Sequence, residues 1–463
     1  MIHEPVIIIG AGPAGLTAAY ELGKRKIRPV VFEKSGMVGG LARTEIYENY
    51  CFDVGGHRFF TKMEDMQRLW EEVLGDEFIK VRRLSRIYYR GQFFNYPLQL
   101  LNTLSNLGLT ESLLILLSYF RAKLLPYPEE KSLEQWVTNR FGRRLFRTFF
   151  KGYSEKVWGM PSHTIQAEWA AQRIQGLSVK TVITNLLFGH NRTKSLINEF
   201  HYPKNGPGSM WDGFRKALEN QGGEVHLHTE AVRFHLEGDC VKGVTFRNGK
   251  QMIETSGNYF ISSIPLKELL LRLDPPPPAE VLRAAKELVY RDFILVGLIV
   301  NRPNLFPDQW VYIHSPELKV GRIQNFKNWS PAMVPDLNKT SLGMEYFCNE
   351  GDDIWQMPDD ELINLATGEL VRLGWVKPDE VEKGSIIRQA NAYPVYGSEY
   401  RDQLQVIREF LSTIKNLQTI GRNGLHRYNN QDHSMLTGVL AVQNMWGANH
   451  DLWELSRHRE YLE

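Results

Sequence analysis

The segment Gly421–Gly438, with the sequence GRNGLHRYNNQDHSMLTG, gathers side chains that can bind an anion near the end of the chain. It carries Arg422, His426 and Arg427 together with Tyr428 and several side-chain amides. The planar guanidinium group makes paired hydrogen bonds to phosphate oxygens, which gives arginine a preference for such ligands. A polar and cationic segment of this kind favours a charged ligand such as a phosphate ester and would not suit an apolar substrate.

A glycine motif with different chemistry lies near the N-terminus. The sequence GAGPAG occupies residues 10–15, after an apolar strand and at the start of a predicted helix. Glycines there allow a tight turn and a close approach to pyrophosphate, while the helix N-terminus supplies N–H donors. Glu33 ends the second strand about twenty residues later, where a carboxylate takes the ribose hydroxyl groups. This βαβ unit predicts a dinucleotide-binding site, and a purely structural glycine turn is the alternative.

The composition excludes several classes of protein. The 463 residues are 43% hydrophobic, which allows two packed domains or one large interleaved unit. The formal net charge of +2 predicts no general affinity for nucleic acid or an anionic membrane, so that any basic site must be local. Cys51, Cys240 and Cys348 form no CxxC pair, which indicates a reducing compartment and neither a disulfide framework nor a thiolate metal site.

One apolar segment raises the question of a membrane. Residues 111–125, ESLLILLSYFRAKLL, have a helical pattern, but the apolar run is too short to span a bilayer, and Arg121 and Lys123 interrupt it. The segment predicts a buried or amphipathic helix, and the alternative is a lip that touches a membrane or a lipid-linked partner. The chain begins without the basic region and cleavage site of a signal peptide, so we expect a cytoplasmic protein.

Periodicity along the rest of the chain separates helical from β-rich regions. We expect a mostly helical region from about Tyr88 to Leu196 and alternating strands over residues 222–264. The sequence DPPPP at residues 274–278 marks a boundary. Beyond it, FILVGLIVN and SLGMEYFCNE predict strands, residues 359–373 predict a helix, and a last helix follows the polar C-terminal segment.

Two further glycine-containing segments carry a resemblance to known flavoproteins. GMVGGLART, residues 36–44, places a glycine pair and Arg43 directly after the strand that ends at Glu33, and FDVGGHRFF spans residues 52–60. Both resemble the amine oxidase and protoporphyrinogen oxidase class of flavoproteins, in which the first segment passes close to the flavin. The resemblance implies that FAD is the resident cofactor and that NAD(P)H is at most an external reductant.

Within that class, six segments resemble UDP-galactopyranose mutases, most closely the eukaryotic type. In chain order they are DVGGH (53–57), FFNYPLQ (93–99), FKGYSEKVWGMP (150–161), YPKNGPGSMW (202–211), QWVYIHSPE…GRIQNFKNWSP (309–331) and RYNNQDHS (427–434). That family interconverts the pyranose and furanose forms of UDP-galactose without net redox change. The N5 atom of reduced flavin is the nucleophile at the anomeric carbon, UDP leaves, and the sugar ring opens and closes again in the other form.

The resemblance assigns roles to individual residues. Arg322 and Arg422 match the pair of arginines that holds the diphosphate, where their charge would stabilise the leaving group. His57 matches the histidine of a mobile loop beside flavin N5, and Tyr428 matches an aromatic residue of the sugar and diphosphate pocket. The N-terminus of the last helix would point at the pyrimidine end of the flavin and stabilise its anionic reduced form, and the alternative role for Asp432 is a simple N-cap.

The motifs and the resemblance together define the predicted site. The predicted catalytic residues are Arg322, Arg422, His57 and Tyr428. The predicted substrate-binding residues are Tyr96 and Gln99 at the uridine base, with Trp310, Arg322, Trp329, Tyr393, Arg422 and Tyr428. The predicted cofactor-binding residues are Gly10, Gly12, Pro13, Ala14, Gly15, Glu33, Lys34, Gly40, Leu41, Arg43, Gly55, Gly56, His57, Val232, Gly421, Arg422, Asn430, Gln431, Asp432 and Ser434. We expect no metal site.

The predicted fold is α/β, with a discontinuous Rossmann-type FAD-binding domain, a helical insert and an antiparallel-sheet substrate domain. The FAD-binding domain should comprise residues 1–90, 203–272 and 385–463, the helical cap residues 91–202, and the sheet-containing substrate domain residues 273–384. The substrate cleft should lie at the domain boundary, with a closing loop near residues 203–208. We expect a UDP-sugar as substrate, no nucleic acid partner and no transmembrane segment, and the pattern leaves the oligomeric state open, a homodimer included.

Three departures from the mutase pattern leave the sugar open. NGPGS at residues 205–209 replaces a more glycine-rich turn, Ser154 replaces an amide, and the spacing within RYNNQDHS is shorter. Another UDP-hexose or pentose, or a nucleotide sugar with a different base, is therefore an alternative substrate. The rival functions are an FAD-dependent oxidase or desaturase and a non-catalytic FAD-binding relative in polysaccharide assembly. The arginine pair favours the mutase.

Overall fold

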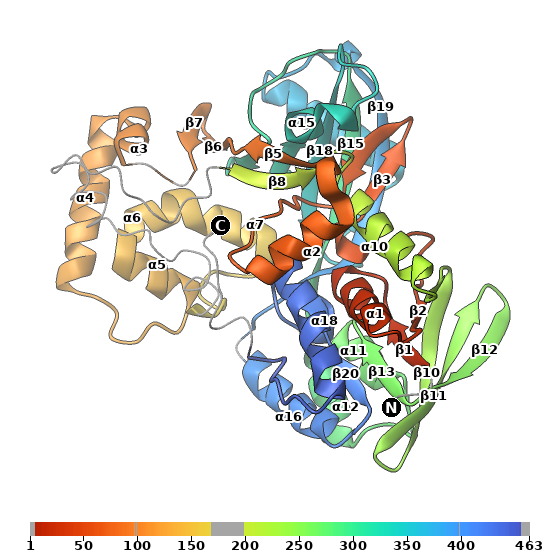
Figure 1. Ribbon diagram of the computed structural model, residues 1–463. Helices are drawn as coiled ribbons and strands as arrows, with labels where there is room; N and C mark the ends of the chain where they lie inside the picture. The colour runs from red at the N-terminus through yellow and green to blue at the C-terminus, as the bar shows by residue number, and fades with distance from the viewer. Residues whose placement is uncertain (1–4, 97, 99, 168–198, 398, 455–463) are drawn as a thin grey trace.

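The computed structural model describes residues 5–96, 98, 100–167, 199–397 and 399–454. Figure 1 shows a group of helices, α3 to α7, on one side of the molecule, and the larger sheets with their covering helices on the other. Within these residues, no helix combines the length and the apolar character needed to cross a bilayer.

A five-stranded parallel sheet is assembled from three distant parts of the chain. Its strand order is β20-β13-β1-β2-β9, and every neighbouring pair runs parallel. The strands are β1 (Val6–Ile9), β2 (Val30–Phe32), β9 (Glu224–His226), β13 (Tyr259–Ser262) and β20 (Leu417–Thr419). Because β1, the following helix and β2 form the predicted βαβ unit, the prediction of a discontinuous Rossmann-type α/β fold is confirmed.

Close backbone contacts fix the position of helix α1 (Pro13–Lys24) on this sheet. A Cβ atom on Gly15 would lie 1.9 Å from the carbonyl oxygen of Gly10. A Cβ atom on Gly438, in helix α18 (Gln431–Met445), would lie 2.5 Å from a carbonyl oxygen of α1. Since any side chain at these positions would push the elements apart, glycine lets α1 pack directly against the loop after β1 and against α18.

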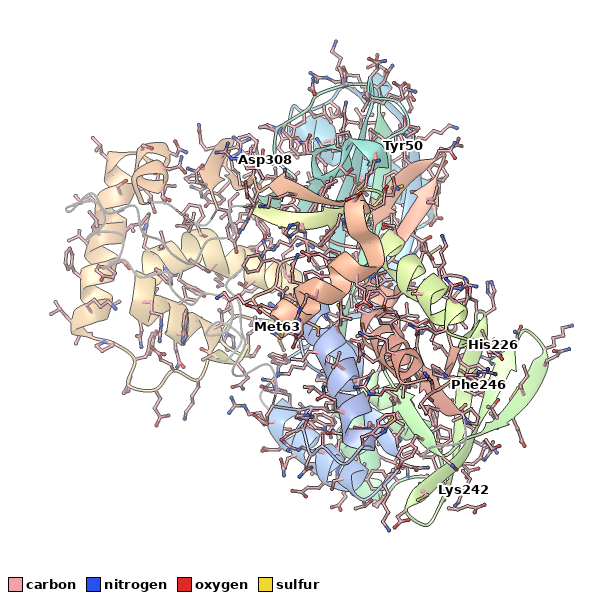
Figure 2. The ribbon with its side chains drawn as sticks, in the orientation of Figure 1. Tyr50, Met63, His226, Lys242, Phe246 and Asp308 are labelled. Atoms are coloured by element: carbon pink, nitrogen blue, oxygen red, sulfur yellow. The ribbon has the colours of Figure 1, made fainter. Side chains whose placement is uncertain are left out.

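A four-stranded sheet packs beside the parallel sheet through aromatic contacts. Its order is β12-β11-β10-β14, with β10 (Thr229–Glu237), β11 (Cys240–Asn248), β12 (Gln251–Ser256) and β14 (Leu273–Asp274). The ring of Phe32, in β2, stacks on Phe246, in β11, with a centroid distance of 3.8 Å, and on His226, in β9 of its own sheet, with a centroid distance of 5.1 Å. Figure 2 labels Phe246 and His226 where the two sheets meet.

The largest sheet has seven strands in the order β19-β15-β18-β17-β16-β6-β7. The strands are β6 (Ser85–Tyr89), β7 (Gln92–Asn95), β15 (Tyr290–Val300), β16 (Trp310–Ile313), β17 (Arg322–Asn325), β18 (Thr340–Cys348) and β19 (Val381–Pro394). All residues of β15 are buried, because it lies between β18 and β19 and is covered by helix α15 (Asp359–Arg372). The strands expected at β15 and β18 and the helix expected at α15 are confirmed.

The helical region follows the β6–β7 hairpin in sequence. Its elements are α3 (Leu100–Leu107), α4 (Leu109–Leu124), α5 (Leu133–Phe141), α6 (Arg143–Leu145), a π-helical turn (Phe146–Lys151) and α7 (Gly152–Trp158). A capping box between Ser132 and Gln135 starts α5. The expectation that helix begins at about Tyr88 was wrong, because β6 and β7 form a hairpin that joins the seven-stranded sheet.

Shorter elements connect these layers. The remaining strands are β3 (Thr44–Tyr47), β4 (Tyr50–Asp53), β5 (Phe78–Arg82) and β8 (Glu199–Pro203). Within the described residues, the other α-helices are α2 (Glu64–Leu74), α10 (Gly208–Asn220), α11 (Leu266–Leu271), α12 (Ala279–Glu287), α13 (Phe326–Trp329), α14 (Asp353–Gln356), α16 (Tyr400–Ser412) and α17 (Gly421–Gly424). Single 3₁₀ turns occupy Gly40–Ala42, Gly75–Glu77, Pro331–Met333 and Pro378–Glu380.

Several of the expected domain boundaries fall inside sheets or between strands that pair with each other. The boundary between residues 90 and 91 falls inside the β6–β7 hairpin, and the boundary at 385 falls inside β19. The boundary at 272/273 separates β10 from β14, which pair with each other. The division into three domains stays a proposal, with residues 85–95 and all of β19 moved to the sheet-containing substrate domain.

A buried carboxylate fastens the β3–β4 hairpin to the loop before α10. The side chain of Asp53 is fully buried and accepts hydrogen bonds from the hydroxyl groups of Thr44 and Tyr202. Thr44 Oγ1 also accepts a hydrogen bond from the backbone N–H of Gly208, at 2.9 Å. Burial raises the pKa of Asp53 to about 7, although the two hydroxyl donors act in the opposite direction. Closure of the loop at residues 203–208 stays a prediction.

We expect the substitution Asp53→Asn to flatten the pH dependence of stability. Since the pKa of Asp53 rises from 3.8 to about 7 on folding, the folded state binds this proton more tightly than the unfolded state. Its contribution is therefore fully present at low pH and is lost as pH rises from about 4 to about 7, by at most about 1.4 kcal/mol per pH unit. Thermal unfolding between about pH 4 and pH 7 should show a steeper fall in Tm for the wild type than for the variant.

The matched control is Asp65→Asn, because Asp65 is exposed and its neutralisation should leave the slope of Tm against pH unchanged. Parallel slopes for the wild type and Asp53→Asn would contradict the assignment.

Candidate active site

A cavity of about 480 Å³ lies at the carboxyl ends of the strands of the parallel sheet. Its walls include Gly10 after β1, Glu33 after β2, Ser263 after β13 and Gly421 after β20. In open parallel sheets, ligands bind at this edge, where the loops diverge.

The walls of this cavity fit a dinucleotide. Gly12 is the N-cap of α1 and carries no side chain, so the N–H groups that start the helix are left for a ligand. A Cβ atom on Gly40 would lie only 3.2 Å from the Cα atom of Gly12. The two loops therefore meet without side chains between them. One carboxylate oxygen of Glu33 accepts a hydrogen bond from the N–H of Ala11 at 2.8 Å, which holds the acid at the edge of the cavity.

Most of the predicted cofactor-binding residues lie together in this cavity. Those that line it are Gly10, Gly12, Pro13, Ala14, Glu33, Lys34, Gly40, Leu41, Arg43, His57, Gly421, Arg422, Asn430, Gln431 and Ser434. Gly55, Gly56 and Asp432 line a second cavity instead, and Gly15 packs against Gly10 beneath the loop.

Val232 is not among the residues that line either cavity. Its neighbours Thr229, Glu230 and Ala231 do line the first one. The pairing of β10 with β11 shifts register between Ala231 and Arg233, so that the bulge leaves Val232 without a partner in the ladder.

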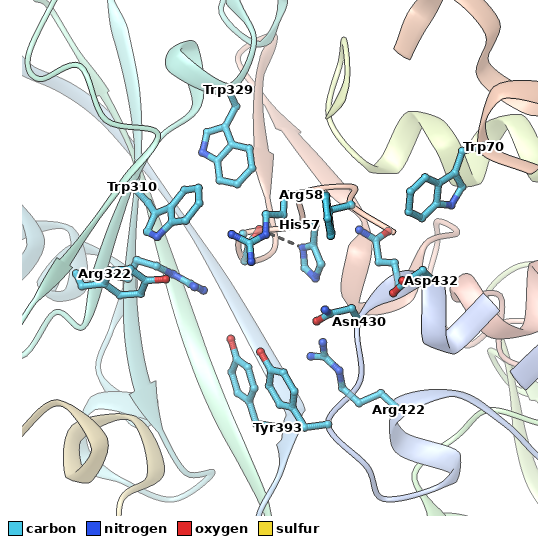
Figure 3. Close-up of a pocket in the computed structure, with 16 residues that line it drawn as sticks. His57, Arg58, Trp70, Trp310, Arg322, Trp329, Tyr393, Arg422, Asn430 and Asp432 are labelled. Atoms are coloured by element: carbon cyan, nitrogen blue, oxygen red, sulfur yellow. Dashed lines mark hydrogen bonds between the residues drawn. The ribbon is translucent and has the colours of Figure 1, made fainter. Parts of the chain in front are cut away.

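The second cavity adjoins the first and has a volume of about 80 Å³ (Figure 3). His57, Arg422, Asn430 and Gln431 line both cavities. The predicted substrate residues Trp310, Arg322, Trp329, Tyr393, Arg422 and Tyr428 all line the second. Tyr96 packs on Tyr312, with a ring-centroid distance of 4.8 Å, and Gln99 lies outside the described residues.

Arg322 enters the second cavity from β17 and is held by a buried acid. Its Nε and Nη2 atoms donate to one oxygen of Glu345, on the adjacent strand β18, at 2.9 and 2.6 Å. The other oxygen of Glu345 accepts a hydrogen bond from Gln324 at 2.6 Å, and Glu345 is fully buried. Burial opposes the charge of Arg322, but Glu345 outweighs it and raises the pKa of Arg322. Glu345 thus orients Arg322 and also balances its charge.

Arg422 enters from the opposite wall and has a different environment. Its guanidinium group donates to the carbonyl oxygens of Asn429, at 2.8 and 3.1 Å, and of Ala392, at 3.2 Å. It also lies 4.6 Å from the ring centroid of Tyr428. In the described chain no carboxylate forms an ion pair with Arg422, so its positive charge is not compensated and is available to an anionic ligand. Figure 3 shows Arg322 and Arg422 directed into the same cavity.

His57 is uncharged at neutral pH in this environment. Removal from solvent lowers its pKa to about 3, and the nearby positive charges of Arg422 and Arg322 act in the same direction. Its Nδ1 atom lies 3.1 Å from the carbonyl oxygen of Gly55. If Nδ1 donates that hydrogen bond, the neutral ring keeps Nε2 as an acceptor.

Aromatic rings form the other walls. Tyr393 and Tyr428 stack with a centroid distance of 5.7 Å and an interplanar angle of 9°. Trp310 and Trp329 stack with a centroid distance of 5.2 Å. Trp329 Nε1 donates to the carbonyl oxygen of Gln309, at 3.1 Å, whereas Trp310 Nε1 is buried without a protein partner. The cavity therefore combines flat apolar surfaces with the guanidinium groups of Arg58, Arg322 and Arg422.

The N-terminus of α18 lies between the two cavities. Asn430 is its N-cap, so the alternative that Asp432 is the N-cap was wrong; Asp432 lies in the first turn and is buried. The amide of Gln431 and one oxygen of Asp432 are buried without hydrogen-bond partners. Buried polar atoms that lack partners are costly, and at a helix N-terminus beside a cavity they suit a polar group of a ligand.

Several residues of the site were missed from the sequence. Arg58 and Tyr312 line the second cavity, and Glu345 holds Arg322. Gln389 accepts a hydrogen bond from Arg43 at 2.6 Å in the first cavity. Arg58 directly follows His57 in the motif GGHR and could have been found there, whereas Glu345 and Gln389 lie in strands without any distinguishing pattern.

Comparison with known proteins gives the same picture for the fold. The solved structure of a reduced UDP-galactopyranose mutase superposes with a TM-score of 0.84 at 22% identity, covering 97% of each chain. A putative protoporphyrinogen oxidase from Exiguobacterium sp. 255-15 superposes with a TM-score of 0.72 at 16% identity, covering 96% of this chain and 99% of that one. At these identities the superpositions establish a shared fold.

Similarity in sequence to curated proteins is more local. A dTDP-fucopyranose mutase from Escherichia coli is 27% identical over 179 residues, which are 35% of this chain and 44% of that protein. The chain spans less than half of the length of the first curated relatives that it matches.

One family model covers most of the chain. The model of flavin-containing amine oxidoreductases matches residues 13–425, which include most of the walls of both cavities. Gly10 and Gly12 lie before the matched range, and the wall residues from Tyr428 onward lie after it. With the glycine loops, the cavity at the carboxyl ends of the parallel strands and the shared fold, this match identifies the chain as a flavoprotein that belongs to the flavin-containing amine oxidoreductase family.

Proposed function

We propose that the protein is a flavin-dependent mutase that interconverts the pyranose and furanose forms of a nucleoside diphosphate sugar, of the UDP-galactopyranose and UDP-galactofuranose type. The observation that carries this proposal is the convergence of Arg322 and Arg422 on one cavity beside the dinucleotide cavity. A diphosphate is the leaving group that such a pair of arginines would hold.

The two arginines would divide the work of binding the diphosphate. Arg322 is oriented by Glu345, so it would supply directed hydrogen bonds with little net charge. Arg422 keeps its charge uncompensated and would balance the charge that develops on the leaving diphosphate. The ring of Tyr428, which stacks on Tyr393, lies against the guanidinium group of Arg422 and would limit its contact with water.

The first cavity would hold FAD, with the glycine loop at its pyrophosphate and α18 near its flavin end. Reduced flavin, when bound, would supply an electron-rich ring nitrogen that can act as a nucleophile toward the anomeric carbon. The N-terminus of α18 would stabilise a negative charge at that end of the site. Neutral His57 would offer hydrogen bonds without adding a further positive charge. NAD(P)H would act at most as an external reductant.

The base and the sugar are open within this proposal. The similarity to a dTDP-fucopyranose mutase supports the class of reaction and adds a thymidine nucleotide to the candidates. UDP-galactose and dTDP-fucose share the diphosphate, so Arg322 and Arg422 would treat them alike.

We expect interconversion only after the flavin is reduced. The purified protein, reduced with dithionite under anaerobic conditions, is incubated with UDP-galactofuranose or dTDP-fucofuranose, and the nucleotide sugars are separated by chromatography. Conversion to the pyranose form should occur with reduced protein and not with oxidised protein. No conversion of either sugar, together with no effect of UDP or dTDP on the flavin spectrum, would reject the diphosphate assignment.

We expect the substitutions Arg422→Ala and Arg322→Ala to differ in their effect on stability and in whether a second substitution recovers the loss. Arg422→Ala should lower kcat/KM about a hundredfold, because the charge on the leaving group loses its balance. Arg322→Ala should lower kcat/KM at least as much and should also destabilise the protein by about 3–5 kcal/mol, because Glu345 is left buried and unpaired. Adding Glu345→Gln to Arg322→Ala should recover part of both losses, as measured by steady-state kinetics and thermal unfolding.

The matched control is Arg86→Ala, which breaks the ion pair of Arg86 with fully buried Asp308 in the same sheet, outside the two cavities. It should lower stability without a selective effect on nucleotide binding. If Arg86→Ala and Arg322→Ala reduced turnover equally, Arg322 would have only a structural role.

The second candidate is an FAD-dependent oxidoreductase, which the family match and the fold of a putative protoporphyrinogen oxidase support. Such an enzyme would produce hydrogen peroxide, or reduce another acceptor, in proportion to the substrate consumed. The polar walls of the second cavity favour the mutase, because an apolar substrate would leave the charge of Arg422 uncompensated and the amide of Gln431 without partners.

A further inference from the structure

Helix α4 exposes an apolar face at the outer edge of the helical region (Figure 1). Leu113, Leu117, Phe120 and Leu124 follow one another at intervals of three or four residues and therefore share one side of the helix. Between 57% and 80% of each side chain is exposed, whereas Ile115, on the side packed against α5 and α6, is buried. A contiguous exposed apolar face of this kind marks an interaction surface.

A basic cavity of about 760 Å³ adjoins this face. It lies between α4, α5, α6 and the turn after β6, and Leu117 and Leu125 belong to its wall. The charged residues of its wall are Arg90, Arg121, Arg143, Arg144, Arg147 and Glu111.

The positive charge of this cavity is largely uncompensated. Arg144 forms two hydrogen bonds with Glu111, at 2.7 and 2.6 Å. For the other four arginines, the described part of the chain provides no ion pair with a carboxylate. The formal net charge of +2 for the whole chain does not reveal this local concentration of arginine side chains. An anionic group that enters the cavity would meet several guanidinium donors at once.

We propose that α4 and the adjoining arginine cavity dock the protein on an anionic phospholipid bilayer. The apolar face would lie among the upper parts of the acyl chains, and the arginines would bind the phosphate groups of the lipid heads. An interfacial helix has this combination of an apolar side and basic residues at its border. With 16 residues, α4 is about 24 Å long and lies on the bilayer instead of spanning it. This proposal is independent of the reaction proposed above.

Charge decides between a bilayer and a second copy of the chain. A twofold contact through α4 would press the same surface against itself. The arginine clusters of both copies would then lie beside one desolvated contact, with Glu111 as the single acid of each cavity wall. Like charges across an interface oppose association, whereas phosphate headgroups complement the arginines.

The test is sedimentation of the purified flavoprotein with lipid vesicles. Vesicles of phosphatidylglycerol and phosphatidylcholine in equal parts are compared with vesicles of phosphatidylcholine alone. One variant combines Leu113→Gln, Leu117→Gln and Leu124→Gln, and a second combines Arg121→Gln, Arg143→Gln and Arg147→Gln. The control combines Lys242→Gln, Lys250→Gln and Lys286→Gln, which remove the same charge from exposed positions outside the helical region; Figure 2 labels Lys242.

We expect the wild type to bind the anionic vesicles and not the neutral ones. The leucine variant and the arginine variant should each bind at least about tenfold more weakly, while the lysine control should bind like the wild type. Because all substituted side chains are exposed, the flavin spectrum and Tm should not change. No binding of the wild type to the anionic vesicles would overturn the proposal, and so would an equal loss in the lysine control. If analytical ultracentrifugation showed a dimer that the leucine variant dissociates, the face would be an interface between copies.

Discussion

Direct contact of backbone with backbone at the start of helix α1 is the constraint on which the rest of the structure depends. Gly15 lies against Gly10, and Gly40 of the second loop lies against Gly12. The N–H of Gly39 donates to the carbonyl oxygen of Ala11 at 2.8 Å, which joins the two loops. Side chains would fill the space that a pyrophosphate needs, so glycine here serves both packing and binding. The positions of β2, β13 and α18 follow from this junction, because all of them pack around it.

The arginines at positions 322 and 422 of the second cavity serve different purposes. Arg322 has a fixed orientation, and Arg422 keeps an uncompensated charge. Arg322 belongs to a strand of the seven-stranded sheet and is fixed by an acid on the next strand. Arg422 belongs to the segment after the parallel sheet and is held by backbone carbonyl groups alone. A ligand between them would therefore bridge the two sheets. Carbonyl oxygens hold Arg422 in place without cancelling its charge, which a carboxylate would do.

Local patterns predicted the elements that have a strong local cause. The βαβ unit follows from the glycine motif between two apolar strands, and β15, β18, α15 and α18 follow from periodicity. The β6–β7 hairpin was not predicted to join the seven-stranded sheet, because its pairing with β16 connects residues more than two hundred positions apart. The bulge that leaves Val232 without a ladder partner and the acid that holds Arg322 also depend on pairing between strands. Such features cannot be found by examining one segment of sequence at a time.

The path of the chain through the parallel sheet also imposes an order in time. A ribosome releases β1, α1 and β2 early, but β20 and the N-terminus of α18 complete the wall of the first cavity only when residues beyond 417 have emerged. Strands this distant in sequence pair slowly, since a large part of the chain must be ordered before they meet. Until then, the glycine loops form an open half-site that faces solvent. The nascent chain can therefore retain the flavin only late in its synthesis. The yellow colour of bound flavin then indicates that synthesis has passed β20.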